Sequence, residues 1–440
     1  MSGQTDPPPG SSEQDQPGGA GAAQRPVPQR SSVTRPRRAP RSHRSEGPAV
    51  ERRSTSSAPA AASASSQQAA PTSGQAAPTP PPEPAASPQG PEAASPAPKK
   101  KARDPLLDNA RAILIALVVV GHTLEQIHTP LAEIVYTWIY SFHMPAFVVI
   151  TGFLSRSYRS EPRQVARLLT SMLIPYLIFQ VIHTVENNVI DGKPISISLW
   201  DPSWTMWFLL ALVFWRLFTP VLRVLRYPLV FAVAISVIAP LDSQVGTELT
   251  WARVLSFLPF FVLGFVATPE HLRKLRDLPG ARAIGAVALV GAFLVAVLTH
   301  GMFSTDIFTL SRSYADMDVA AWYGVVTRIM VLICGTVLSL AVVMVSPRRH
   351  HWYTEIGVQS LTIYLAHAAL LQIPRNLEWS DAVTKDWQTV IAVAMALALV
   401  VLLSRGPVVR ALSWVTSPPI EKFLVREPEG RSTAPAATKP

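Results

Sequence analysis

The chain contains very little cysteine. Cys334 is the only one among 440 residues and lies in an apolar run, which excludes a disulfide framework and a multi-cysteine metal site. Charge is also scarce, since Asp, Glu, Lys and Arg make up only 15% of the residues. No apolar stretch of the kind found in a cleavable signal lies near Met1, so no such signal is expected.

Aromatic residues are missing from residues 1–103, which are rich in Pro, Ala, Ser, Gln and Gly. A segment of this kind has no apolar face to bury, so we expect a disordered cytoplasmic tail, partly polyproline-like. The mean hydropathy of +0.24 therefore arises from the rest of the chain. We expect a membrane domain over residues 104–415 and a second disordered tail over 416–440.

A net charge of +10 raises the question of nucleic-acid binding, because the tail contains the basic clusters SVTRPRRAPRSHRS and PKKKAR. Lys and Arg also collect at the cytoplasmic flanks of membrane helices, where they rest on anionic lipid. We favour this second interpretation, with membrane lipid as a partner and no nucleic acid.

About ten apolar segments have the length of a membrane span. The fifth and sixth are short, and no internal repeat is evident. The segments centre near Val118, Phe147, Ile174, Leu210, Ala234, Phe260, Val290, Leu332, Tyr364 and Ala396.

Positive charge alternates between the loops that join these segments. With the first tail in the cytoplasm, the exits of the even-numbered spans carry runs such as RLFTPVLRVLR and SPRRHH, whereas the opposite loops carry far fewer cations. The positive-inside rule then predicts an all-α polytopic bundle in the plasma membrane with both termini cytoplasmic.

The first apolar segment, RAILIALVVVGHTLEQI, holds Arg111 and His122. They are eleven residues apart, so on an α-helix the two side chains point in directions that differ by only about 20° around the axis. They therefore lie on one face of the helix, roughly 16 Å apart along it. Asp108 is placed to pair with Arg111, and Glu125 to orient His122. An ionisable group at membrane depth is costly and tends to mark a functional interior. The alternatives are a snorkelling Arg111 and a structural, hydrogen-bonded His122.

The second segment holds another histidine, His143, next to Met-Pro. Pro145 frees a carbonyl and favours a kink, so we expect His143 to share a polar cavity with the first helix, although a packing histidine fits equally well. Thr151 and Gly152 form a small-residue surface that another helix can approach closely.

Three stretches together resemble the acyltransferase-3 family of integral membrane acyltransferases, in particular its fucose 4-O-acetylase-like branch. They are DNARAILIALVVVGH, with Arg and His separated by ten residues, YSFHMPAFVVITGFL and EIGVQSLTIYLAHAALL. SWTMWFLLALVFWR agrees as well. The resemblance covers about residues 104–410, which is the whole expected membrane part.

The resemblance implies transfer of an acyl group, commonly acetyl from cytoplasmic acetyl-coenzyme A, to a hydroxyl of a carbohydrate, glycolipid or related acceptor. It makes Arg111 and His122 necessary for activity. Two features depart from the family pattern: Arg163 and Arg167 are four residues apart instead of three, and Thr151 replaces the usual serine. Arg163 and Arg167 are nevertheless candidates for binding the donor phosphates.

The chemistry of the residues fits that activity. A thioester is already electrophilic, so the main need is a base for the attacking hydroxyl, and histidine is best suited near neutral pH. We expect His122 to be this base, Glu125 to orient it, and Arg111 to hold the donor. A covalent acyl-histidine is the other route. No metal is expected.

Four more residues are candidates for lining the cavity: Thr151, Trp207, Tyr364 and His367, the last two only three positions apart. Packing explains each of them too. A proton-coupled transporter or lipid-linked sugar flippase is the rival function, but no paired halves are visible. A third possibility is a scaffold protein whose membrane part serves only as an anchor. Such a protein would have no need for histidines within its membrane segments, such as His122 and His143.

Overall fold

The computed structural model describes residues 105–190, 192–194, 196–246, 248–416 and 418. All of them belong to one unit of the chain, Ser95–Pro440. The expected tails over 1–103 and 416–440 lie outside the described residues, except for Thr416 and Pro418. The described residues form helices and connecting segments with no strand, as the sequence predicted.

Six stretches are long and apolar enough to cross a membrane. Two of them are composite: residues 141 and 142 interrupt 130–157, and a π-helical stretch, η2 (Leu169–Leu173), lies within the continuous helix 162–190. The six are α1 (Pro105–Leu124); α2 (Pro130–Tyr140) with α3 (His143–Leu154) and η1 (Ser155–Ser157); α4 (Pro162–Leu168) with η2 (Leu169–Leu173) and α5 (Ile174–Ile190); α12 (Ala281–Leu298); α14 (Ala321–Val345); and α17 (Asp386–Leu403).

A seventh crossing is obtained if a bent pair counts as one span. This pair joins η5 (Glu248–Thr250) and α9 (Trp251–Ser256) to α10 (Leu258–Val266) at 55°. The remaining helices are shorter. They are η3 (Trp204–Met206), α6 (Trp207–Leu217), α7 (Thr219–Val224), α8 (Pro228–Ile238), η4 (Ala239–Leu241), α11 (Pro269–Asp277), α13 (Asp306–Thr309), α15 (Thr354–Val358), α16 (Ser360–Asn376), η6 (Trp379–Ala382) and α18 (Gly406–Thr416).

The expectation of a polytopic helical protein is thus confirmed, whereas ten spans and cytoplasmic termini stay predictions. Each of the ten predicted segment centres does fall within a helix. The difference lies in length, since α6 and α8 have 11 residues each, or roughly 16 Å at 1.5 Å per residue. A helix of that length does not cross a hydrocarbon core of about 30 Å unaided.

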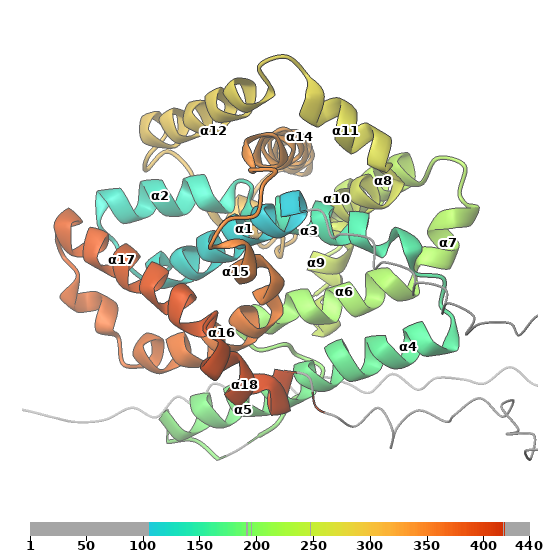
Figure 1. The fold of residues 1–440 in the computed structure, drawn as a ribbon. Coiled ribbons are helices and arrows are strands. Elements are labelled where there is room, and N and C mark those ends of the chain that lie inside the picture. The colour runs from blue at the N-terminus through green and yellow to red at the C-terminus, as the bar shows by residue number, and fades with distance from the viewer. Residues whose placement is uncertain (1–104, 191, 195, 247, 417, 419–440) are drawn as a thin grey trace, which may run out of the picture. The chain divides into compact units, whose positions relative to one another are not determined.

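The first helix occupies the interior of the bundle. Figure 1 shows α1 surrounded by other helices, and α2, α3, α14, α15, α16 and α17 all pack against it. Most of its side chains are buried, among them Leu114, Ile115 and Val119 with no exposed surface. An all-round apolar helix of this kind belongs in the core, so its few polar residues must be satisfied by protein neighbours.

Two glycines set the contact between α3 and α10. A methyl group added at Gly152 would lie 2.1 Å from the Phe261 carbonyl oxygen, and one at Gly264 would lie 1.9 Å from the Val149 carbonyl oxygen. Only glycine permits backbones this close. The small-residue surface that the sequence predicted at Gly152 is therefore a helix–helix contact.

Substitution at this crossing is expected to loosen the bundle. Gly264→Ala forces α3 and α10 apart and should lower the free energy of unfolding by about 1–3 kcal/mol, the usual cost of overpacking. Gly291→Ala on α12 is the matched control, because nothing lies within 4 Å of the added methyl. Thermal unfolding of the purified protein in detergent compares the two. Equal melting temperatures for both variants and the wild type would contradict the close contact.

Candidate functional site

His122 lies two residues before the C-terminal end of α1, and its side chain is 14% exposed. Its Nδ1 is 3.0 Å from Glu125 Oε2. Since the carboxylate oxygen accepts, the imidazole donates from Nδ1, and Nε2 is left as the basic nitrogen. The carboxylate thus fixes the tautomer and orientation of the ring, as the sequence suggested.

Glu125 is held by two further side chains from distant parts of the chain. Trp204 Nε1 donates to Oε2 at 3.0 Å, and Arg375 Nη1 lies 3.1 Å from Oε1. The Arg375 guanidinium also sits 4.7 Å from the centroid of the Trp204 ring, within the range of a cation–π contact. Glu125 therefore joins the end of α1 to η3 and α16.

Glu125 is a carboxylate at neutral pH. Burial alone would raise its pKa, but the hydrogen bond and charge of His122, together with Arg375 and Trp204, outweigh burial and lower the pKa from 4.5 to about 2. The ionised carboxylate accepts the hydrogen bond from His122 Nδ1 and so holds the ring in place. The pair has the arrangement that a histidine base requires.

A cavity of about 90 Å³ adjoins this pair. Tyr140, whose hydroxyl is 3.3 Å from His122 Nδ1, is one of its walls. His143 is another; it donates from Nδ1 to the Ile139 carbonyl at 2.8 Å, and its ring lies 4.6 Å from that of Tyr140. The structure thus brings His122 and His143 to one cavity.

Arg253 lines the same cavity from α9. Its guanidinium lies 5.1 Å from the ring centroid of Trp207, which is also in the lining. Glu125 lines the cavity too and interacts electrostatically with Arg253, although no carboxylate among the described residues lies within ion-pair distance of it. The cavity therefore contains a cation beside a histidine that is held by a carboxylate.

Strained backbone positions flank the cavity. Leu249 and Thr250, with φ of 49° and 57°, precede α9 and hence Arg253, and Trp204 has a φ of 37°. Non-glycine residues in this region cost of order 1–3 kcal/mol each and cluster at functional sites. One of the strained residues, Trp204, lines the cavity itself, and the other two immediately precede the helix that carries Arg253.

α16 places a third histidine against His122, although the cavity lining does not include it. His367 is fully buried, donates from Nδ1 to the Ile363 carbonyl at 2.9 Å, and stacks on His122 with 5.8 Å between ring centroids. Its Nε2 has no hydrogen-bond partner among the described residues. Tyr364 points elsewhere: its hydroxyl donates to the Thr205 carbonyl, and its side chain is not part of the cavity lining.

Arg111 lies apart from this cluster. Its Nη1 is 3.1 Å from Asp108 Oδ1, the pairing that the sequence predicted, and its Nη2 donates to Ser360 Oγ at 2.6 Å. Thr151 is also remote from the imidazole cavity; its hydroxyl donates to the Val148 carbonyl within α3.

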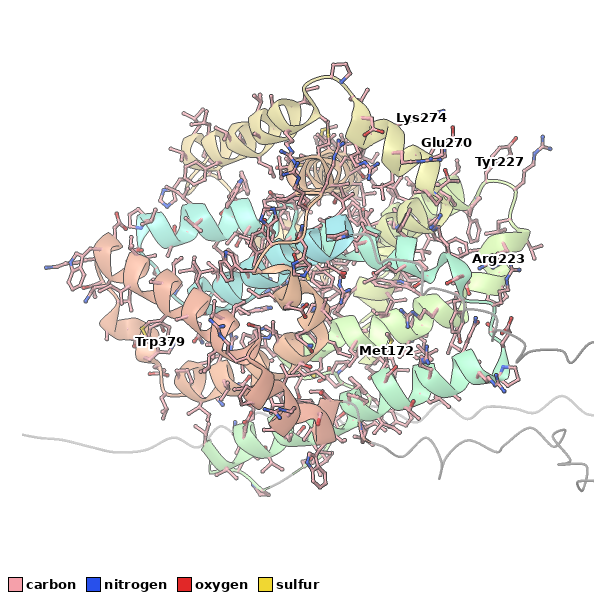
Figure 2. All side chains as sticks on the ribbon, viewed as in Figure 1. Met172, Arg223, Tyr227, Glu270, Lys274 and Trp379 are labelled. Atoms are coloured by element: carbon pink, nitrogen blue, oxygen red, sulfur yellow. The ribbon has the colours of Figure 1, made fainter. Side chains whose placement is uncertain are left out.

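A second pocket, of about 200 Å³, lies where α3 is followed by α4. Arg167 lines it together with Arg216 of α6 and Tyr158, whose hydroxyl is buried and has no hydrogen-bond partner in the described part of the chain. Arg216 Nε donates to Ser155 Oγ at 3.2 Å, and its Nη1 is 3.3 Å from Met172 Sδ, a residue labelled in Figure 2. Arg163 is exposed and lies outside this lining.

Sequence reasoning did not single out Arg253, Arg375, Tyr140 or Trp204 as site residues. The aromatic stretch around Trp204 and the arginine after Pro374 were visible signals, but nothing local says that both reach Glu125. Among the described residues, no three His, Cys, Asp or Glu side chains are grouped as a metal site.

Comparison with known proteins gives the family. The acyltransferase domain family matches residues 104–405. Two curated relatives are both named nodulation protein NolL. The one from Mesorhizobium japonicum is 29% identical over 37% of this chain and 48% of its own length, and the one from Sinorhizobium fredii is 22% identical over 68% and 86%.

The chain thus spans about half the length of the first of these relatives. No solved structure matches it significantly. The family match covers well over half of the chain and includes α1, the second apolar stretch and the whole site around Glu125. The chain therefore belongs to the acyltransferase-3 family of membrane acyltransferases, as the residues around Arg111, His122 and His143 predicted.

Proposed function

We propose that the protein is an O-acyltransferase that moves an acetyl group from cytoplasmic acetyl-coenzyme A to a hydroxyl of a carbohydrate or related acceptor. The observation that carries the proposal is the cavity that combines the His122–Glu125 pair with Arg253. A base and a cation at one cavity are what acyl transfer from a thioester needs.

In the proposed step, His122 Nε2 takes the proton of the acceptor hydroxyl while the hydroxyl oxygen bonds to the thioester carbonyl carbon. The carbonyl oxygen becomes an oxyanion, and Arg253 stabilises it. The carbon–sulfur bond then breaks, and the imidazolium returns the proton to the departing sulfur. Glu125 stabilises the imidazolium throughout. An acyl-histidine route would use the same Nε2 as nucleophile.

The donor phosphates belong at the other end of the bundle. The positive-inside prediction places the start of α1 and the α3–α4 turn on the cytoplasmic side. Arg167 and Arg216, with the free Tyr158 hydroxyl, offer two cations and a donor to a phosphate. Arg111, part-way along α1, would contact the pantetheine arm, and Arg163 the outer phosphates.

The location of the acyl end follows from the same topology. His122 is at the far end of α1, so the acceptor would approach from outside the plasma membrane while the donor stays in the cytoplasm. Both termini would be cytoplasmic. His143 and Trp207 would shape the cavity around the acetyl group, and His367 would position His122 by stacking.

Loss of the base is expected to abolish turnover. His122→Ala should lower the hydrolysis of labelled acetyl-coenzyme A by the purified protein at least about 100-fold, the usual contribution of a general base. His350→Ala is the control, because His350 is exposed on a loop, outside the cavity lining, with its Nε2 3.7 Å from Glu355 Oε1. Equal hydrolysis by wild type and His122→Ala would reject His122 as the base.

Arg253 is expected to act on the transition state. Arg253→Gln should lower kcat roughly 100- to 1,000-fold with little change in the KM for the donor, as on removal of one oxyanion donor. Arg282→Gln, an exposed arginine of α12, is the control. A rise in KM with kcat unchanged would show that Arg253 binds the ground state instead.

The donor pocket can be tested with a donor that lacks one phosphate. The wild type should prefer acetyl-coenzyme A over its 3′-dephospho form, and Arg167→Ala should lose most of that preference, because the substituted arginine no longer meets the phosphate. The preference is measured as the ratio of the kcat/KM values for the two donors. A preference that is the same in wild type and Arg167→Ala would place the phosphate elsewhere.

A further inference from the structure

Two packed aromatic rings form part of the lining of the imidazole cavity, the space beside His122. The volume of this cavity, about 90 Å³, is less than half the 200 Å³ of the pocket at Arg167. Trp207 and Phe257 both belong to the lining, and we call this pair of rings the aromatic wall. Their side chains are buried, so the wall is part of the protein interior and does not face open lipid or water.

The aromatic wall is held on several sides. The ring centroids of Trp207 and Phe257 are 5.2 Å apart, and Phe260 lies 6.0 Å from Phe257 on the α10 side. The Arg253 guanidinium is 5.1 Å from the centroid of the Trp207 ring. In a close-packed interior a ring with such neighbours cannot turn aside to admit a larger group. The wall therefore limits what fits into the cavity.

The backbone ties the aromatic wall to the proposed oxyanion donor. Phe257 follows Arg253 by four residues, and its N–H donates to the Arg253 carbonyl at 2.9 Å. Residues four apart are neighbours on one helical face, and both side chains do line the cavity. A thioester whose carbonyl oxygen meets Arg253 therefore has its acyl carbons close to the wall.

We propose that Phe257 and Trp207 set the length of the acyl group that the protein transfers. Acetyl fits between Arg253 and the aromatic wall, whereas each added methylene meets a ring that cannot move away. This inference rests on the proposed function and adds to it the residues that determine donor specificity.

The test compares two donors that differ by one methylene. The purified full-length protein is given labelled acetyl- or propionyl-coenzyme A without an acceptor, and kcat/KM for hydrolysis is measured with each. The wild type should favour acetyl by about tenfold or more, the usual effect of one methylene in an apolar pocket. Phe257→Leu, which makes the wall smaller, should lower that ratio at least about threefold by improving the use of propionyl.

Phe261→Leu is the matched control, because Phe261 is equally buried on α10 but lies outside the cavity lining, and its ratio should equal that of the wild type. Trp207→Phe makes the same wall smaller and carries the test if Phe257→Leu does not fold. Equal use of both donors by the wild type, or a ratio that neither substitution in the wall lowers, would overturn the inference. Failure of the proposed function looks different: hydrolysis of acetyl-coenzyme A would then be the same in wild type and His122→Ala.

Discussion

The carboxylate of Glu125 connects more of the candidate site than any other group. One oxygen accepts from His122 and Trp204, and the other faces Arg375, so three segments far apart in the sequence converge on it. Each of these contacts involves a charged or strongly polar group in a mostly apolar bundle, where leaving one partner unpaired is costly. The geometry of His122 therefore depends on η3 and α16 being in place.

The scaffold around this cluster is rigid for a different reason. Contacts between α3 and α10 are made at backbone distance through Gly152 and Gly264, and Gly357 of α15 approaches α1 in the same way, since a methyl group there would lie 1.8 Å from the Asp108 carbonyl oxygen. In an apolar solvent such close packing replaces the hydrophobic drive that holds a water-soluble core together. Glycines at the helix crossings thus allow the helices to pack closely, and Glu125 positions the side chains of the candidate site.

Local sequence features anticipated a large part of this. Spacing along one helix was enough to predict the Asp108–Arg111 and His122–Glu125 pairs, because residues three apart are neighbours on a helix. It was also enough to expect a close approach at Gly152 and a shared cavity for His122 and His143. Arg253, Trp204 and Arg375 could not be assigned in this way. Their partners are set by tertiary packing, and an arginine in an apolar run looks the same whether it snorkels or faces a cavity.

Cations lie at both ends of the proposed reaction. Arg167 and Arg216 line the pocket where α3 is followed by α4, and they would meet the phosphates of the donor. Arg253 lines the imidazole cavity beside the His122–Glu125 pair, where it would meet the thioester carbonyl. The length of the pantetheine arm would bridge the distance between the two.

The most direct test is an experimental structure of the protein with a thioether analogue of acetyl-coenzyme A, which cannot be cleaved. We expect the acetyl carbonyl in the cavity between His122 and Arg253 and the 3′-phosphate near Arg167. An analogue bound with its acetyl group away from His122, and with Glu125 still closed around Trp204 and Arg375, would contradict it.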